Sequence, residues 1–299
     1  MDIYYLILYF FTYGFLGWCA EVAYAAVKEK RFVNRGFLNG PICPVYGVGV
    51  SAVLLLLEPF ENNLVILYVA SVIIVTLIEG LTGFALDKIF HHKWWDYSGQ
   101  PFNIGGYVCP IFSLVWGVAC IFIVKVFQPL VYRVAEALPH ALGVALIVVL
   151  SIVTFADLYV TASGILKFNK RLEMMERIAS ELRDISDKMG SNIYENVMDT
   201  MEKQEEVGKK LDEVTDDIKG KLEEFGGEQK ERAAQQKERA VQLREYYVQL
   251  KERYAQLAKS STKVSERLVK AFPKMESRNH KDILEELQKG LEDKRKKGK

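Results

Sequence analysis

The 299-residue chain balances its charges almost evenly, with 39 lysine and arginine residues against 38 aspartate and glutamate residues. A net charge near zero gives no overall pull toward nucleic acid, so we expect no nucleic-acid partner. The basic residues are unevenly divided, because eight of them lie in residues 1–166 and 31 in residues 167–299. We therefore expect an apolar first half and a charged second half.

Five apolar segments of the first half are predicted to be transmembrane helices. Such a helix needs about 20 residues, because lipid offers no partner for unpaired backbone groups. The five predicted spans are Ile3 to Val27, Pro41 to Leu57, Leu64 to Leu86, Pro110 to Val131, and Ala141 to Leu166, of which the second is the shortest. The sequence thus predicts an all-α fold, with residues 1–166 forming a polytopic bundle in the lipid bilayer.

Basic residues in the connections between the spans predict the orientation. The first connection holds Lys28, Lys30, Arg31 and Arg35, and the third holds Lys88 and Lys93. The second connection has no basic residue and the fourth has only Arg133. Because cytoplasmic loops carry the excess of lysine and arginine, the N-terminus is predicted outside and the C-terminus in the cytoplasm.

Residues 167–272 are predicted to form cytoplasmic helices of the coiled-coil kind, because apolar residues recur there near heptad spacing. These residues are Leu172, Met175, Ala179, Leu182 and Met189 in a first stretch, and Leu243, Tyr247, Leu250, Tyr254 and Leu257 in a second. Gly226-Gly227 separates the stretches and Pro273 ends the second, which predicts a helical hairpin. The stretches are expected to pack on each other or on a second copy of the chain. Residues 273–299 are expected to form a short basic helix or a disordered end.

Three acidic residues, Glu21, Glu79 and Asp157, lie inside predicted spans. A charged side chain at mid-membrane costs about 2.5 kcal/mol or more, so such residues are usually functional. Each lies about 9 to 14 Å from the cytoplasmic end of its helix, which predicts a shared layer of carboxylates. They would bind a cation, pass on protons, or pair with a basic group such as Arg35. Buried hydrogen bonds or ion pairs that hold the bundle together are an equally good interpretation.

The first and third connections contain more glycine, proline, asparagine and aromatic residues than plain connectors need. This composition is typical of loops tucked against a helix bundle, and it adds Asn39, Asp96 and Asn103 as candidate binding residues. The pair Trp94-Trp95 is typical of the membrane interface. His91-His92 is interpreted as a solvated interfacial cluster, and no metal can be assigned.

The two connections also resemble each other. Residues 40–46, Gly-Pro-Ile-Cys-Pro-Val-Tyr, match residues 106–112, Gly-Tyr-Val-Cys-Pro-Ile-Phe, and each follows a helix with a glutamate in its last third. This predicts an internal duplication of a two-helix hairpin, with the copies related as parallel repeats. Cys43 and Cys109 would then occupy equivalent structural positions, as would Glu21 and Glu79.

Several of these motifs resemble the putative ABC-transporter type IV permease family of bacterial membrane proteins, over roughly residues 5 to 165. The motifs are Phe15-Leu16-Gly17-Trp18 with Glu21, residues 34–41 with Cys43-Pro44-Val45-Tyr46-Gly47, Trp94-Trp95-Asp96-Tyr97 with Pro101-Phe102-Asn103, and Ser113 with Trp116-Gly117. Ala271-Phe272-Pro273-Lys274-Met275 with Ser277 resembles a tail motif of some relatives. The resemblance implies a bacterial cytoplasmic membrane location and a permease-like role.

The sequence lacks the motifs of several enzyme classes. No Gly-x-x-x-x-Gly-Lys-[Ser/Thr] occurs, so an ATPase would have to be a separate subunit. No Gly-x-Ser-x-Gly or His-Glu-x-x-His occurs either, and we expect neither enzyme activity nor a cofactor. The leading hypothesis is a permease for a small solute or ion. The alternatives are a membrane-anchored scaffold or regulator whose tail recruits a cytoplasmic partner or a second copy of the chain as a homo-oligomer, and an intramembrane enzyme using the carboxylates with Cys43 or Cys109.

Overall fold

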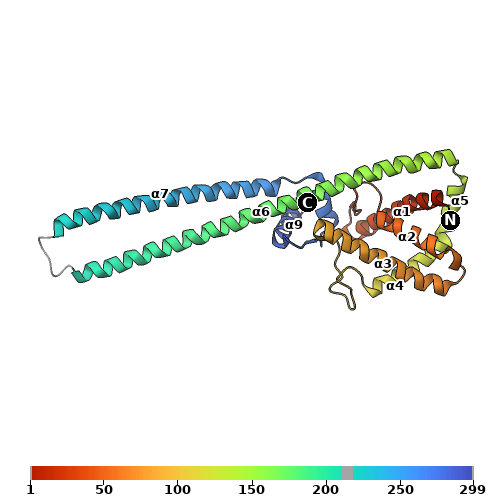
Figure 1. Ribbon diagram of the computed structural model, residues 1–299, viewed down its shortest axis with the longest axis horizontal. Coiled ribbons are helices and arrows are strands. Elements are labelled where there is room, and N and C mark those ends of the chain that lie inside the picture. Colours follow the sequence, from red (N-terminus) through yellow and green to blue (C-terminus); the bar gives the residue numbers. More distant parts are fainter. Residues whose placement is uncertain (1, 211–217, 298–299) are drawn as a thin grey trace. The chain divides into compact units, whose positions relative to one another are not determined.

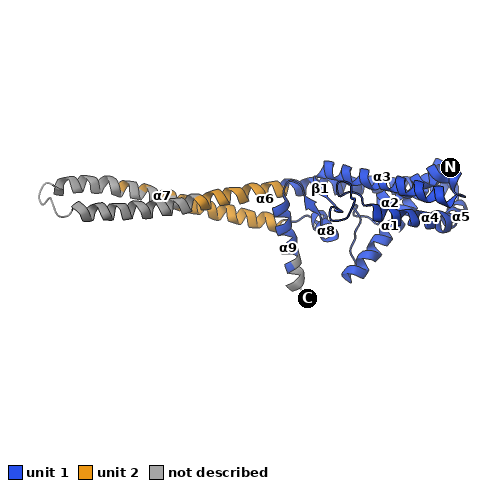
Figure 2. Ribbon diagram, turned by 90° about the horizontal axis from the view of Figure 1, so that it is seen from below, with its two compact units in different colours: residues 1–170, 261–299 blue, residues 171–260 orange. Residues whose placement is uncertain are grey.

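The computed structural model describes residues 2–210 and 218–297, and most of these residues are helical. The side chains outside the description are those of residues 188–230, 232–234, 236–237, 240, 292 and 294–297. The chain divides into two compact units, which are coloured separately in Figure 2. Unit 1 comprises Met1–Lys170 with Ser261–Lys299, and unit 2 comprises Arg171–Ser260. The predicted seam residue Met189 lies outside the described side chains.

Unit 1 is a helix bundle to which the C-terminal segment returns. Its helices are α1 (Ile3–Glu29), α2 (Pro44–Leu57), α3 (Leu64–Phe90), α4 (Pro110–Phe122), α5 (Gln128–Ala137), the first part of α6 (His140–Lys210), α8 (Lys263–Ala271) and α9 (Lys281–Lys297) (Figure 1). A 3-10 turn, Glu58–Phe60, follows α2, and a π-helix, Ile123–Phe127, joins α4 to α5. Strand β1 (His92–Lys93) pairs antiparallel with β2 (Glu276–Ser277).

Four helical stretches are long and apolar enough to cross a membrane. They are Ile3–Glu29, Leu64–Phe90, Pro110–Ala137 and His140–Asp187. The second predicted span is a shorter apolar helix, Pro44–Phe60, which at the usual helical rise extends about 25 Å against a hydrocarbon core of about 30 Å. It begins later than predicted because Cys43, still extended, donates its N–H to the Gly14 carbonyl at 2.9 Å.

The helices α2 and α4 begin in the same way. Cys43 and Cys109 are the extended N-cap residues, and Pro44 and Pro110 occupy the first helical position. Proline is tolerated there because its missing N–H would have no partner in the helix. Both cysteines are buried and reduced. This local likeness agrees with a duplicated hairpin, which remains a prediction.

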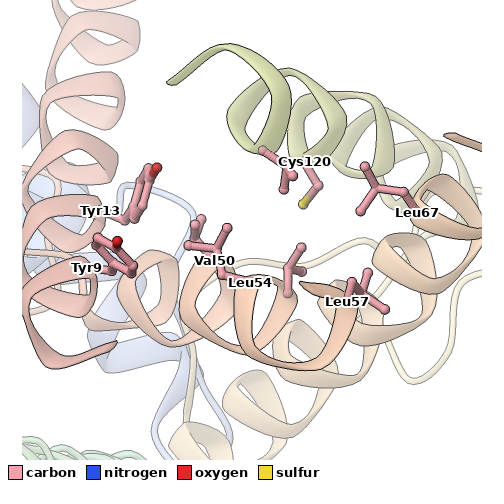
Figure 3. Packing of buried hydrophobic residues seen from close by; sticks show 9 residues of the cluster. Tyr9, Tyr13, Val50, Leu54, Leu57, Leu67 and Cys120 are labelled. Carbon is pink, nitrogen blue, oxygen red and sulfur yellow. The ribbon is translucent and has the colours of Figure 1, made fainter. Parts of the chain in front are cut away.

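An apolar core joins the helices of the bundle (Figure 3). It includes Tyr9 and Tyr13 of α1, Val53 of α2, Leu67 of α3 and Cys120 of α4. The hydroxyl of the buried Tyr13 has a hydrogen-bond partner, because it donates to Gln128 Oε1 at 2.7 Å. Large apolar side chains on the outer faces of the bundle helices are exposed, as expected of surfaces that meet lipid.

Unit 2 contains the part of α6 after Lys170 and all of α7 (Ile218–Lys259). The two helices run antiparallel and pack through an apolar cluster of Ile178, Leu182, Ile185, Leu243, Tyr247, Leu250, Tyr254 and Leu257. All five residues of the second predicted seam belong to this cluster, whereas Leu182 is its one member from the first seam and Ile178 and Ile185 were not predicted. The prediction that Gly226-Gly227 separates the helices is wrong, because α7 continues through both residues. A glycine costs about 1 kcal/mol in a helix, which the packing of a long helix can offset.

Candidate functional site

The first connection (residues 30–43) and the third connection (residues 91–109) lie at one end of the bundle, which we call the loop end. Phe37 of the first connection packs on Trp94 of the third, with ring centroids 5.2 Å apart. Phe272 of the C-terminal segment packs on the other side of the contact, 5.0 Å from Trp94. The loop end is therefore built from three segments far apart in the sequence.

Glu21 has two partners at the loop end. The Tyr46 hydroxyl donates to Glu21 Oε1 at 2.6 Å, and Arg35 Nε lies 3.3 Å from Glu21 Oε2. Tyr46 is positioned by two neighbours, since its ring covers Gly17 and meets the Trp116 ring edge-on. A side chain at position 17 would overlap the Tyr46 ring, which explains the glycine there.

Glu79 is held less completely. The Tyr97 hydroxyl donates to Glu79 Oε1 at 3.2 Å, whereas Glu79 Oε2 is buried and has no hydrogen-bond partner. Tyr97 stacks on Phe112 of α4, with ring centroids 5.0 Å apart. Burial raises the pKa of Tyr97, and the charges of Glu79 and Glu21 raise it further. Each glutamate thus accepts a hydrogen bond from a tyrosine hydroxyl, and we call Glu21, Tyr46, Glu79 and Tyr97 the acid–tyrosine cluster.

Asp157 of α6 is bound by the first connection instead. Its carboxylate accepts hydrogen bonds from the Asn39 N–H at 3.1 Å, the Gly40 N–H at 2.6 Å and the Asn39 side-chain amide at 2.7 Å. Thr161, one turn later, donates to it at 3.2 Å. A carboxylate with this many donors is stabilised in its charged form. Its geometry is that of a structural anchor for the loop.

Arg267 of α8 binds the same loop from the opposite side. Its guanidinium donates to Asn39 Oδ1 at 2.9 Å and to the carbonyls of Gly36 and Phe37, each at 2.7 Å. All three acceptors are neutral, and burial lowers the pKa of Arg267. Asn39 therefore joins α6 to α8, and we call Asn39, Asp157, Thr161 and Arg267 the Asn39 junction.

Arg278 makes a second arginine junction with α3. Its Nε lies 2.6 Å and 2.8 Å from the two carboxylate oxygens of Asp87, and its Nη2 binds the same carboxylate. The Tyr107 hydroxyl donates to Asp87 and accepts from Arg278. Asp87 is 2 % exposed. Hydrogen bonds to Asp87 raise the pKa of Arg278, so this pair stays charged.

His92 links these elements to α6. The ring is buried, contrary to the prediction of a solvated histidine pair, because strand β1 pairs with β2 over it. Asn169 donates to the Phe90 carbonyl, which turns its Oδ1 toward His92 Nε2 at 2.6 Å. Nε2 must then carry the proton in the neutral ring.

Acidification should destabilise the loop end through His92. Burial lowers the pKa of His92, and the nearby His280 and His91 lower it further. Below about pH 6.5 the unfolded chain therefore binds a proton that the folded chain resists, so stability falls as the pH falls through this window. The thermal midpoint between pH 7.5 and 5 should fall less in His92→Gln than in the wild type. His140, exposed at the start of α6, gives a control, because His140→Gln should keep the wild-type dependence; an unchanged dependence in His92→Gln would contradict the prediction.

The other predicted site residues shape the third connection. Asp96 accepts hydrogen bonds from the Ser98 N–H and hydroxyl, and Asn103 bonds the carbonyls of Ser98 and Gln100. Gly106 has φ +78°, and a Cβ there would lie 2.3 Å from Asp96 Oδ1. Asp96 and Asn103 thus fix a turn of the third connection.

The paired tryptophans of this connection differ in their surroundings. The Trp95 indole donates to the Tyr107 carbonyl at 2.9 Å. Trp94 is buried between Phe37 and Phe272, so it does not mark the interface with lipid. Cys43 and Cys109, at the starts of α2 and α4, are N-caps.

Several residues of the loop end were not singled out by sequence reasoning, namely Tyr46 and Tyr97 as partners of the acids, Asp87, Arg267 and Arg278. The tail motif around Phe272 and Ser277 was the available signal, since Phe272 packs on Trp94 and Ser277 pairs with His92. Among the residues that the structure describes, no group of three histidine, cysteine or acidic side chains is placed to hold a metal ion.

Comparison with known proteins adds one finding. The family model described as putative ABC-transporter type IV matches residues 8–162. The match covers the bundle and includes the three acids of the spans and Asn39. No curated protein and no solved structure matches the chain.

Proposed function

The chain belongs to the putative ABC-transporter type IV family, and from this membership we propose that it is the membrane component of a transporter for a small solute or ion. The family and the apolar helices support a membrane location. The absence of a Gly-x-x-x-x-Gly-Lys-[Ser/Thr] motif means that any ATP hydrolysis would come from a separate ATPase subunit.

The proposed topology has five spans, with the N-terminus outside and the loop end and tail in the cytoplasm. The short apolar helix Pro44–Phe60 is the fifth span in this arrangement, and thinning of the bilayer around it would compensate for its length. The basic residues of the first and third connections support the orientation.

The acid–tyrosine cluster is the observation that carries the transport proposal. Its members come from both hairpins, because Glu21 and Tyr46 belong to α1 and α2, whereas Glu79 belongs to α3 and Tyr97 precedes α4. Glu79 Oε2 is buried without a partner, which is costly for a carboxylate. A bound cation or a proton at this oxygen would relieve that cost, so we assign the contact with the transported species to Glu79. Asp157, whose donors are Asn39, Gly40 and Thr161, has a positioning role.

Replacing Glu79 tests the assignment. In proteoliposomes that hold the purified chain, K⁺, Na⁺ and proton fluxes are followed with an entrapped pH-sensitive dye and ion-selective electrodes. Glu79→Gln should lower the flux of the transported ion at least about tenfold, because a neutral amide loses the electrostatic stabilisation of a cation in a low-dielectric site. The exposed acid Glu61, at the other end of α2, provides the control Glu61→Gln, which should retain wild-type flux. A wild-type ion flux in Glu79→Gln, with normal incorporation of the protein into the vesicles, would contradict the assignment of Glu79 as the contact with the transported species.

The second candidate function, a membrane-anchored scaffold, is favoured by the surface of unit 2. Val241, Tyr246 and Val248 of α7 are large apolar side chains that are about half exposed, on a helix that is otherwise charged. Such residues suit a partner protein or a second copy of the chain. In this alternative the bundle is an anchor, and unit 2 carries the function.

Shortening the hairpin of α6 and α7 separates the two candidates. Deleting everything after Lys170 would also remove Arg267 and Arg278, which bind the bundle. We therefore replace residues 178–250 with a short Gly/Ser linker, which removes Val241, Tyr246 and Val248 and keeps α8 and α9. The transporter proposal predicts that ion flux survives this change. The scaffold proposal predicts that a cellular phenotype of the gene is lost with the hairpin and unaffected by Glu79→Gln.

A further inference from the structure

A basic pocket of about 330 Å³ lies between the first connection and α8. Its lining includes four basic side chains and one acid, namely Arg31, Lys263, Arg267, Lys270 and Glu266. Both walls belong to unit 1. The pocket is separate from the acid–tyrosine cluster, none of whose members line it.

The positive charge of the pocket is only partly neutralised. Arg31 pairs with Glu29 at 2.7 Å. Arg267 donates to three neutral oxygens, and among the described residues neither Lys263 nor Lys270 forms an ion pair. Cations gathered in a concave site attract an anion, and a phosphate group accepts several such donors at once.

The position of the pocket along α1 indicates the source of that anion. With 27 residues, α1 is about 40 Å long, so it exceeds a hydrocarbon core of about 30 Å and its last turns reach the headgroup level. Phe32, which lines the pocket there, is 69 % exposed, and Val27 in the last turn of α1 is 83 % exposed. A soluble phosphate would not use these apolar groups, whereas a phospholipid would contact them with its acyl chains.

We propose that the pocket binds the phosphate group of an anionic phospholipid. The lipid would contact the first connection and α8 together, so it would hold the C-terminal segment against the bundle next to the Asn39 junction. Basic pockets at the cytoplasmic ends of membrane helices are suited to anionic headgroups. The proposal requires a membrane location and does not depend on the transport role.

Lipid titration of the full chain tests the proposal. The chain is purified in neutral detergent and titrated with phosphatidylglycerol or phosphatidylcholine, and bound lipid is counted by native mass spectrometry. The wild type should prefer phosphatidylglycerol. Removing two charges with Lys263→Gln/Lys270→Gln should weaken its binding about thirtyfold. Lys263→Arg/Lys270→Arg keeps the charges and should bind phosphatidylglycerol as the wild type does.

A matched control distinguishes the pocket from general surface charge. Lys274→Gln/Lys289→Gln removes two exposed lysines of the same segment that do not line the pocket, and it should leave the affinity unchanged. An equal loss in this control, or equal affinity of the wild type for the two lipids, would overturn the proposal. Displacement of the lipid by inorganic phosphate at equal concentration would also overturn it, because the site would then be one for soluble phosphate.

Discussion

Replacing Arg267 with methionine should destabilise the loop end by about 3 kcal/mol. The guanidinium supplies three hydrogen bonds, to Asn39 Oδ1 and to the carbonyls of Gly36 and Phe37. A hydrogen bond to a charged group contributes about 1.5 to 3 kcal/mol, and three on one side chain are not additive. The methionine retains the apolar stem but leaves the three acceptors without their donor. Asn39 would also lose the link that joins α6 to α8.

Thermal unfolding in detergent and limited proteolysis of the C-terminal segment measure this effect. Arg267→Met should lower the thermal midpoint and expose residues 261–297 to cleavage while the bundle remains intact. Lys270→Met removes an exposed cation from the same helix, and it should change stability by no more than about 0.5 kcal/mol. The importance given to the Asn39 junction would be wrong if the two variants behaved alike.

Removing the Asp87 carboxylate should have an effect of similar size. Asp87→Ala leaves the Arg278 guanidinium without its bidentate acceptor and the Tyr107 hydroxyl without its acceptor. Because Asp87 is buried while Arg278 is half exposed, water can replace part of the lost interaction, and we expect a loss of about 2 to 3 kcal/mol. Charge–charge attraction contributes to this pair, so the loss should shrink when salt screens it.

A double-mutant cycle isolates the pair from other effects of the substitutions. Asp87→Ala and Arg278→Gln should be strongly non-additive, because either change alone removes the same interaction. Asp282→Ala, an exposed acid in the first turn of α9, is the control and should combine additively with Arg278→Gln. Additive losses from Asp87→Ala and Arg278→Gln would contradict a direct contribution of this junction to stability.

The apolar helices could be located from the sequence because a helix that crosses lipid must be long and apolar. The expected start at Leu64 is the start of α3, and the predicted Ile3 to Val27 differs from α1 by two residues at its end. The fourth predicted span ends earlier than the helical stretch, which continues through a π-helix to Ala137. Pro129 lacks an N–H and crowds the preceding turn. The i→i+5 hydrogen bonds of the π-helix before it make room for the proline ring, so the helix continues past it.

Contacts between distant segments were not predictable in the same way. Arg267 and Asn39 are 228 residues apart, and Arg278 and Asp87 are 191 residues apart. Hydrophobic periodicity reports the environment of each residue along one helix and carries no information on which distant loop an arginine will meet. The division of the tail at residues 166 and 272 rests on periodicity and on Pro273, whereas the compact units group residues 261–299 with the bundle.

The acidic residues of the spans could be identified from the sequence, because a charged side chain is costly in lipid. The hydrogen-bond partners of each acid could not be identified in this way. Glu21, Glu79 and Asp157 were expected to share one layer. Glu21 and Glu79 each accept from a tyrosine hydroxyl, while Asp157 is bound by Asn39 and Gly40 of the first connection. Which acid receives backbone N–H groups depends on the path of a loop, and loop paths are not encoded in apolar spacing.

The return of the C-terminal segment to the loop end has a consequence for biosynthesis. The ribosome makes the chain from its N-terminus, so the five apolar segments leave it before Arg267 and Arg278 have been added. About 100 residues separate Leu166 from Arg267, and at roughly 5 to 20 residues per second their synthesis takes about 5 to 20 seconds. During this interval Asn39 and Asp87 lack their arginine partners. A nascent chain that terminates early would keep an unfinished loop end, which gives quality-control proteases a means to tell full-length molecules from truncated ones.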